Sequence, residues 1–150
     1  MAPRIFFDTN ILVYAFDDRF PAKQETARRV LAETPSEDTV LSVQVLEEFV
    51  ATTTRKLRPP LSAEAAAGVV RDLSRHTVVP VDTTLILSAI SRTVTDPVVF
   101  WDALILEAAL AAGCERLYSE DFQHGRVFDG LRIVNPLLDE GASPRARSRP

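Results

Sequence analysis

The chain has 150 residues, of which 46% are hydrophobic and 25% are charged, a length and composition that suit one folded domain and exclude wholesale disorder. Its formal net charge is −4, but the last ten residues hold three arginines and no acid, so residues 1–140 carry 14 basic and 21 acidic residues, a charge of −7. A uniformly basic surface for nucleic acid is therefore excluded there, and any nucleic-acid contact needs a local basic patch or bound cations.

Apolar runs rich in β-branched residues alternate along the chain with stretches of helical periodicity. The sequence predicts strands at residues 4–8, 39–43, 77–81, 116–119 and 131–134, and helices at 21–34, 44–57, 62–75, 82–93 and 101–112. This alternation predicts an α/β fold, with a central, mostly parallel sheet and helices on both of its faces. We expect one domain over residues 1–138 and a disordered basic tail over 139–150.

Two absences bear on the compartment. The only cysteine, Cys114, excludes an intramolecular disulfide and a cysteine-built zinc site, and it favours a reducing compartment. No apolar run approaches the roughly 18 residues needed to cross a bilayer, and Asp8 interrupts the first apolar stretch where a signal peptide would continue. The sequence therefore predicts a cytoplasmic protein with no membrane segment.

Acidic residues stand where an α/β fold places its chemistry, at the carboxyl ends of the strands. Asp8 ends the first predicted strand, Asp121 follows the strand at 116–119, and Asp102 lies in the first turn of the most apolar helix. Converging carboxylates repel one another unless a cation neutralises them, and oxygen ligands of this kind suit Mg²⁺ or Mn²⁺. Each acid also has a purely structural interpretation: Asp8 and Asp102 as helix-terminus acids, and Asp121 as a loop acid.

A fourth acid could come from the adjacent pair Glu47 and Glu48. Helical periodicity collects one apolar face and turns Glu48 away from it, which favours a solvent-exposed charge. That face consists of Leu46, Phe49, Val50, Thr53 and Leu57. A second stripe could instead line a cleft, and it consists of Val45, Glu48, Thr52 and Lys56. Periodicity alone leaves both interpretations open.

Four stretches of the chain together resemble the PIN-domain ribonucleases, and more closely the VapC toxins of bacterial toxin–antitoxin pairs. They are FFDTNILVYAFD (6–17), SVQVLEEFVATTTRK (42–56), FWDALILEAALAAGC (100–114) and RLYSEDFQHGRVFDGLRIVNP (116–136), and the resemblance covers residues 4–137. It implies a PIN-like three-layer α/β/α domain. It also implies a Mg²⁺-dependent endoribonuclease, with Mn²⁺ as a substitute, that hydrolyses RNA to leave a 5′ phosphate.

The resemblance also assigns the site. Its catalytic acids fall on Asp8, Glu48, Asp102 and Asp121, with Asp8, Asp102 and Asp121 as metal ligands and Glu48 assisting. Neighbouring hydroxyl and amide groups fall on Thr9, Asn10 and Ser119. The implied partners are the RNA substrate, a second copy of the chain in a homodimer, and a VapB-type antitoxin that holds the toxin inactive in a hetero-oligomer.

Three further features of the sequence could contact a substrate or a metal. Arg55, Lys56 and Arg58 form one dense basic cluster, which could bind substrate phosphates or simply end a helix favourably. Trp101 could stack a base, but its place at the head of an apolar helix favours core packing. His124 is not expected to bind metal.

Other classes of protein remain as alternatives. A phosphatase with an aspartyl nucleophile also begins with a strand ending in Asp, but it wants a second acid where this chain has Asn10. A PIN-like nuclease acting on DNA, or in RNA processing outside a toxin–antitoxin pair, would share the same acids. A non-catalytic module could use the acidic pocket to bind a basic peptide.

Overall fold

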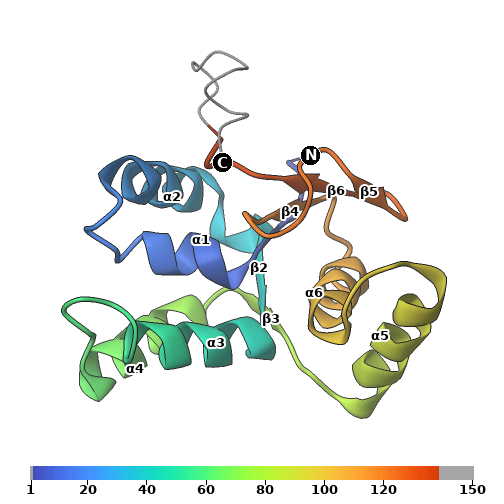
Figure 1. Ribbon diagram of the computed structural model, residues 1–150, viewed down its shortest axis with the longest axis horizontal. Coiled ribbons are helices and arrows are strands. Elements are labelled where there is room, and N and C mark those ends of the chain that lie inside the picture. The colour runs from blue at the N-terminus through green and yellow to red at the C-terminus, as the bar shows by residue number, and fades with distance from the viewer. Residues whose placement is uncertain (1, 139–150) are drawn as a thin grey trace.

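The computed structural model describes residues 2–138, in which one sheet lies between two layers of helices (Figure 1). The predicted tail at 139–150 lies outside the described residues. The strands are β1 (Ile5–Phe7), β2 (Thr39–Ser42), β3 (Thr77–Val79), β4 (Arg116–Tyr118), β5 (Val127–Phe128) and β6 (Leu131–Val134). The helices are α1 (Thr9–Tyr14), α2 (Pro21–Glu33), α3 (Val43–Thr53), α4 (Ala63–Leu73), α5 (Thr83–Thr95) and α6 (Phe100–Ala111), with a short 3₁₀ turn at Ser36–Asp38.

The sheet has the strand order β3-β2-β1-β4-β6-β5, and every neighbouring pair is parallel except β5 with β6. Figure 1 shows α1 to α4 on one side of the sheet and α5 with α6 on the other. The prediction of a three-layer α/β/α domain with a mostly parallel sheet is therefore confirmed.

The central strands are apolar on both faces because helices cover both. Phe6 and Phe7 of β1, Leu41 of β2, Leu117 of β4 and Ile133 of β6 are fully buried. Such strands appear in sequence as continuous apolar runs rather than alternating ones, which is why short stretches such as RIFFD were recognisable.

Helix boundaries follow their capping residues. Ser62 and Asp82 accept hydrogen bonds from the backbone N–H groups of Ala65 and Leu85 and so begin α4 and α5, as predicted. The predicted helix at 44–57 was too long, because α3 ends at Thr53 and its last residues form turns before Pro59.

The sequence prediction missed β5, which forms a hairpin with β6. Asp129 and Gly130 occupy the turn with φ angles of 49° and 89°, the left-handed backbone of a two-residue hairpin. Because β5 has only two residues, it carries no periodicity of its own, although its Asp-Gly pair is a hairpin signal.

Two further expectations can be compared with the described residues. Cys114 is buried, and burial raises the pKa of its thiol to about 12. Within residues 2–138, no helix combines the length and apolar character that a membrane crossing requires.

The strand order fixes where a ligand site belongs. From β1 the chain proceeds outward to β2 and β3, then crosses back to β4 on the other side of β1. The crevice at the carboxyl ends of β1 and β4 is therefore the topological switch point, the usual ligand position in such sheets. Asp8 follows β1 and Ser119 follows β4, so the predicted acids arrive at that crevice.

Candidate active site

Asp8 is the most buried acid of the crevice, with 5% of its surface exposed. Its Oδ1 accepts the Thr9 backbone N–H at 2.7 Å, and its Oδ2 accepts the Ser119 hydroxyl at 2.7 Å. The structural interpretation of Asp8 is therefore confirmed, since it begins α1 as its N-cap, and its role as a metal ligand stays a prediction. Burial raises the pKa of Asp8 to about 6 despite these bonds, and the nearby charges of Asp121 and Glu48 raise it further.

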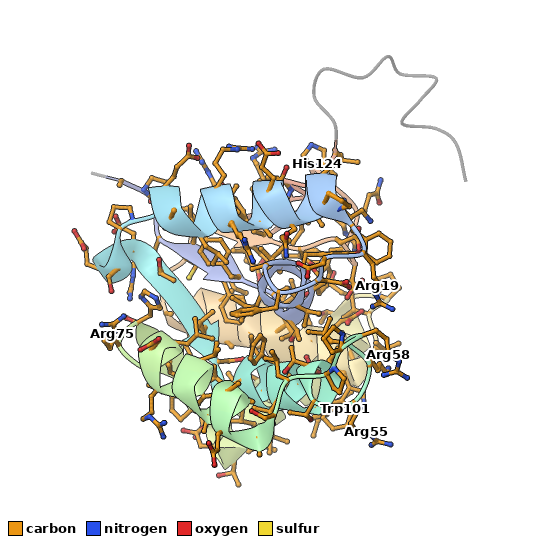
Figure 2. The ribbon with its side chains drawn as sticks, turned by 90° about the vertical axis from the view of Figure 1, so that its left-hand side faces the viewer. Arg19, Arg55, Arg58, Arg75, Trp101 and His124 are labelled. Atoms are coloured by element: carbon orange, nitrogen blue, oxygen red, sulfur yellow. The ribbon has the colours of Figure 1, made fainter. Side chains whose placement is uncertain are left out.

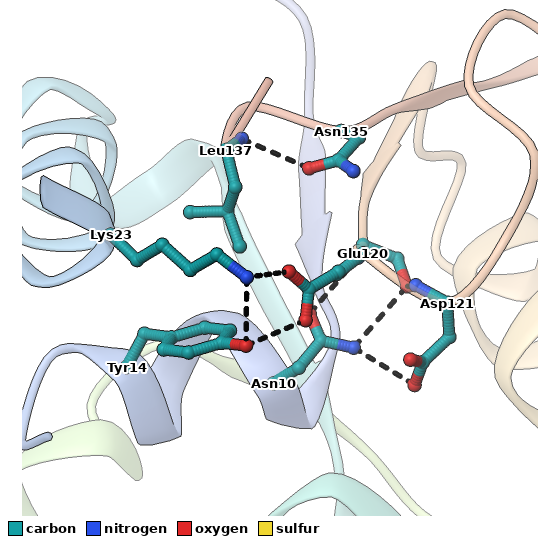
Figure 3. Close-up of polar contacts among 8 residues, drawn as sticks. Asn10, Tyr14, Lys23, Glu120, Asp121, Asn135 and Leu137 are labelled. Atoms are coloured by element: carbon teal, nitrogen blue, oxygen red, sulfur yellow. Dashed lines mark hydrogen bonds and ion pairs between the residues drawn. The ribbon is translucent and has the colours of Figure 1, made fainter. Parts of the chain in front are cut away.

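Asp121 is held on the β4 side of the crevice by uncharged groups. Its Oδ2 accepts the Asn10 side-chain amide at 3.0 Å, and its backbone N–H donates to the Ser119 hydroxyl oxygen at 3.0 Å. Asn10 also accepts the Glu120 backbone N–H at 3.1 Å, which ties α1 to the loop after β4 (Figure 3). Asn10 and Ser119 thus both form hydrogen bonds with the predicted acids, and their supporting role in a reaction stays a prediction.

Glu48 lies half-buried on α3 and faces α1. Its Oε1 accepts the Thr9 hydroxyl at 2.7 Å, and its Oε2 accepts the Gln44 amide at 3.3 Å. Glu47 beside it is exposed. Of the pair, Glu48 is therefore the member that faces α1, and the interpretation that periodicity favoured, a solvent-exposed charge, does not describe it. Its catalytic role stays a prediction.

The apolar face of α3 was also predicted with the wrong rotation about the helix axis. Val45 is buried and Val50 is 37% exposed, so the helix is rotated toward the stripe that carries Glu48 and Thr52. Those two residues line a cleft beside α1, as the second interpretation of the helix allowed.

Asp102 joins the site from the first turn of α6. Burial raises the pKa of its carboxyl, and the charges of Asp121 and Glu48 raise it further. The charges of Asp121 and Glu48 thus act on both Asp8 and Asp102, which brings the four predicted acids into one electrostatic group.

The sequence matches the PIN domain family over residues 5–128. The chain belongs to that family. No curated protein sequence matches it. Among solved structures, this PIN domain is similar to Mycobacterium tuberculosis VapC20, described as a toxin that cleaves the sarcin–ricin loop, with a TM-score of 0.63 and 26% identity over 78% of this chain and 89% of that one.

Two other solved structures share the fold at lower identity. A toxin–antitoxin complex from Klebsiella pneumoniae has a TM-score of 0.67 and 19% identity, covering 88% of this chain and 97% of that one. FitAB bound to an IR36 DNA fragment has a TM-score of 0.67 and 17% identity, covering 91% and 97%. The resemblance to PIN-domain ribonucleases is confirmed at the level of the family, and the VapC20 structure supports the closer likeness to VapC toxins.

The donor set of this PIN domain fits a hard divalent cation. All four acids offer carboxylate oxygens, which Mg²⁺ and Mn²⁺ prefer, and no ion pair involves any of them within residues 2–138. Each Asp8 oxygen accepts one hydrogen bond and keeps further acceptor capacity. In the described part of the chain, no three acidic, histidine or cysteine side chains already stand in metal-ligand geometry. The fit is therefore one of chemistry and charge.

The predicted basic cluster lies at the end of α3. Arg55, Lys56 and Arg58 are exposed, and Nη1 of Arg58 donates to the carbonyl oxygens of Arg55 and Leu57 at 3.0 and 3.1 Å. Figure 2 shows Arg55 and Arg58 along the same edge of the molecule as Arg19. The helix-end interpretation accounts for the Arg58 contacts, and phosphate binding stays a prediction.

Two other sequence predictions can now be compared with the structure. Trp101 was expected in the core, but 64% of its surface is exposed, so this prediction was wrong. The apolar core of α6 begins only at Ala103, and Trp101 precedes the part of the helix that packs on the sheet. His124 accepts the Asn135 backbone N–H at 3.0 Å through Nδ1.

Sequence reasoning missed two groups that support the site. Gln44 donates to Glu48 and to the Trp101 carbonyl oxygen at 3.3 Å, linking α3 to α6. Its spacing of four residues from Glu48 is the only sequence signal for this contact. Figure 3 shows the second group, in which Lys23 binds Glu120 at 2.6 Å and Tyr14 donates to the same carboxylate at 2.8 Å. Nothing in the sequence indicates that Lys23 of α2 meets the loop after β4.

Proposed function

We propose that this PIN domain is a metal-dependent endoribonuclease and the toxin of a toxin–antitoxin pair. It hydrolyses RNA phosphodiester bonds and inhibits translation or growth until its antitoxin binds. The observation that carries the proposal is the convergence of Asp8, Glu48, Asp102 and Asp121 at the switch point with no ion-pair partner in residues 2–138. The likeness to VapC20, described as an RNA-loop-cleaving toxin, supports RNA as the substrate.

The ion would be Mg²⁺, with Mn²⁺ as a substitute, held by Asp8, Asp102 and Asp121 with assistance from Glu48. When bound, such an ion lowers the pKa of water and offsets the charge of the substrate phosphate. The overall reaction adds water across the phosphodiester bond, breaks the bond to the 3′ oxygen and leaves a 5′ phosphate.

The chain's own contribution is orientation. The Ser119 hydroxyl and the Thr9 N–H fix both oxygens of Asp8, and Asn10 fixes Asp121. Supporting hydrogen bonds of this kind orient metal-binding carboxylates, and their removal commonly costs 10- to 100-fold in activity, roughly. The Thr9 hydroxyl does the same for Glu48. The acids are therefore held in place against their mutual repulsion.

Substrate phosphates would bind the exposed cations at the end of α3, Arg55, Lys56 and Arg58. These side chains lie beyond Thr52, which lines the cleft together with Glu48. Neutralising them should weaken RNA binding and flatten its dependence on salt. Unchanged binding by Arg55→Gln and Lys56→Gln would remove this part of the proposal.

The expected partners follow from the same function. The acidic pocket would attract a basic side chain of a VapB-type antitoxin, and the similar Klebsiella pneumoniae structure is a toxin–antitoxin complex. A homodimer, and a hetero-oligomer with the antitoxin, are part of the proposal. Light scattering of the chain alone and of the co-expressed pair measures both states.

The deciding experiment incubates total cellular RNA with the full chain in Mg²⁺ or Mn²⁺ and compares wild type with Asp8→Asn and Asp102→Asn. We expect discrete cleavage products from wild type, loss of cleavage in both variants, and loss on addition of EDTA. Glu47→Gln is the matched control, because it removes an exposed carboxylate next to Glu48 and should cleave like wild type.

The outcomes separate the alternatives. Cleavage that resists EDTA, or persists in both aspartate variants, would contradict the catalytic assignment. Cleavage of single-stranded DNA in preference to RNA would favour the DNA nuclease. Absence of cleavage together with tight binding of a basic peptide would favour the non-catalytic module. Growth arrest on expression, relieved by the adjacent gene, tests the toxin–antitoxin role separately.

A further inference from the structure

A cleft of about 470 Å³ opens beside α1 and connects the acids to a separate group of side chains. Glu48 and Asp121 line it near the first turn of α1, whereas Arg19 and Phe20 line it beyond the last turn. Val13 and other residues of α1 form the wall between them. The volume lies within the roughly 300–1,000 Å³ range of small-molecule sites. The cleft is therefore large enough for a ligand that also reaches the carboxylates.

Arg19 is held in a fixed position at the far end of the cleft. Its Nε and Nη2 donate to the two carboxylate oxygens of Asp17, each at 3.0 Å, and its backbone N–H donates to the same carboxylate at 3.1 Å. Asp17 is 4% exposed, and these hydrogen bonds lower the pKa of its carboxyl. Arg19 is about half-exposed, and its Nη1 makes no hydrogen bond to any residue in 2–138. A buried acid thus orients an arginine that still has a donor to offer.

Phe20 places an aromatic ring beside that donor. The ring is 44% exposed, and the Arg19 guanidinium carbon lies 5.7 Å from its centroid. Tyr14 packs against the ring edge-on at 5.7 Å. An exposed aromatic ring next to an arginine is the combination that single-stranded nucleic-acid sites use, because bases stack on the ring and a phosphate accepts from the cation.

We infer that this cleft is a nucleotide subsite of the nuclease, and the inference rests on the proposed function. A nucleotide of the RNA next to the cleaved bond occupies it, with its base packed against Phe20 and a phosphate oxygen accepting from Nη1 of Arg19. Phe20 and Arg19 are then substrate-positioning residues, and they set where the phosphodiester bond lies relative to the acids.

The charge arrangement favours RNA over a peptide. The cleft carries the carboxylates of Glu48 and Asp121 at one end, and at the other the Arg19–Asp17 ion pair, from which Nη1 of Arg19 remains as a donor. A basic peptide suits the first end only, whereas a nucleotide places its neighbouring phosphates at both, one at the acids with the cation they bind and one at Arg19. Figure 2 shows Arg19, Arg58 and Arg55 along one edge of the molecule, and of the three Arg19 lines the cleft. A polyanionic strand matches this edge.

The test measures Mg²⁺-dependent cleavage of a short single-stranded oligoribonucleotide of mixed sequence by the full chain. Phe20→Ala should raise KM about tenfold with kcat within about twofold, the scale of losing one base–aromatic stack. Phe20→Leu, which keeps apolar volume without a ring, should resemble Phe20→Ala, and Phe20→Tyr should resemble wild type.

The charge of Arg19 is tested by binding rather than turnover. With a fluorescein-labelled oligoribonucleotide in an Asp8→Asn background, adding Arg19→Gln should reduce the slope of log affinity against log salt by about 0.7, the value for one phosphate contact on a single strand. Arg19→Lys keeps the charge and should keep the slope. Both substitutions lose the paired hydrogen bonds to Asp17, but only Arg19→Gln also leaves this buried carboxylate without a cation, so urea denaturation of each variant must show that it is folded before the slopes are compared.

Matched controls exist on the same chain. Phe16 is 38% exposed and packs on Phe49 outside the cleft, so Phe16→Ala should leave KM unchanged. Arg29 on α2 is 55% exposed and pairs with Glu33, so Arg29→Gln should leave the salt slope unchanged. Equal losses from Phe16→Ala and Phe20→Ala would overturn the inference.

Three further results would refute the subsite. A wild-type KM in both Phe20→Ala and Arg19→Gln would refute it while leaving the nuclease intact. Loss of growth rescue by the antitoxin with an unchanged KM would assign the cleft to a protein partner instead. No cleavage by wild type and no RNA binding by Asp8→Asn would overturn the proposed function and the subsite together.

Discussion

Neutralising Asp8 should stabilise the protein in a way that depends on pH. Burial raises the pKa of this carboxyl from 3.8 to about 6, so the folded protein holds the proton more tightly than the unfolded chain does. At about 1.36 kcal/mol per pH unit, ionised Asp8 costs the folded state about 3 kcal/mol. The cost is absent below pH 4, develops between pH 4 and 6, and is complete above pH 6.

Asp8→Asn removes this titration but keeps the shape of the side chain. The amide also changes the hydrogen bonds with the Thr9 N–H and the Ser119 hydroxyl. Because neither group titrates between pH 4 and pH 8, this change adds the same free energy at every pH. The quantity to measure is therefore the difference in free energy of unfolding between variant and wild type. It should shift in favour of Asp8→Asn by about 3 kcal/mol between pH 4 and pH 7.

Urea denaturation followed by circular dichroism, in EDTA at each pH from 4 to 8, gives both free energies. Glu47→Gln is the control, because it neutralises an exposed carboxylate and its difference from wild type should stay flat. A difference for Asp8→Asn that is also flat, or that moves against the variant as pH rises, would refute the argument. Adding Mg²⁺ should stabilise wild type more than Asp8→Asn, since an ion that binds only the folded state raises its stability.

Three other perturbations test different parts of the molecule. Ser119→Ala removes a buried hydroxyl that donates to Asp8 at 2.7 Å and accepts the Asp121 backbone N–H. It should lower RNA cleavage about 10- to 100-fold, measured by initial rates, and the free energy of unfolding by about 1–3 kcal/mol, measured in urea. Arg92→Gln breaks the ion pairs to three carboxylates that join α5, α6 and the β5–β6 turn. It should lower the free energy of unfolding in urea by about 2 kcal/mol. Arg29→Gln removes one partner of an exposed pair and should lower it by less than about 0.5 kcal/mol. The single tryptophan, Trp101, is 64% exposed one residue before Asp102, a proposed metal ligand, so its fluorescence should change when RNA is titrated in; constant emission at saturating RNA would contradict RNA binding at this end of α6.

The central strands of the sheet could be predicted from the sequence because they are buried on both faces. Phe6, Phe7 and Leu117 belong to continuous apolar runs bounded by acids or turn residues. Such a run can be recognised as a buried strand from the local sequence alone, without knowing which strands pair with it. The β5 strand could not be predicted in this way, since a strand of two residues shows neither an apolar run nor an alternation of side chains. The Asp129-Gly130 pair was the one local feature that could have indicated a hairpin there, and it was not used.

The places of Asp8 and Asp121 at the ends of strands could be predicted from the sequence, but the place of Glu48 beside them could not. Asp8 and Asp121 follow strands, and strand ends meet at the switch point whatever the side chains are. The position of the Glu48 side chain depends on how α3 is rotated about its axis relative to α1. The periodicity of α3 alone does not determine that rotation. The hydrogen bond from Thr9 to Glu48 fixes that rotation, and it joins residues 39 positions apart.

Arg19 and Phe20 lay outside every sequence prediction for a related reason. The chain between α1 and α2 has no period, and its acid and arginine appear in sequence as ordinary surface charges. Only the fold shows that Asp17 is buried, that it holds Arg19, and that the cleft beside α1 leads from this pair to the acids. Sites built from a connecting segment and a helix wall depend on tertiary placement, which local patterns do not encode.

The choice of supporting groups explains how the site stays acidic inside a folded domain. Asp8, Glu48 and Asp121 are held by a backbone N–H, hydroxyls and amides, all of them uncharged donors. Arginine or lysine in these places would have lowered the repulsion, but it would also have cancelled the negative potential that attracts a divalent cation. Lys23 instead pairs with Glu120, the neighbour of Asp121, and so leaves the acids uncompensated (Figure 3). In the part of the chain that the structure describes, the fold therefore holds an array of carboxylates without a cation of its own, which is what the proposed divalent ion would need, and the pH dependence of Asp8→Asn measures what this arrangement costs in stability at Asp8.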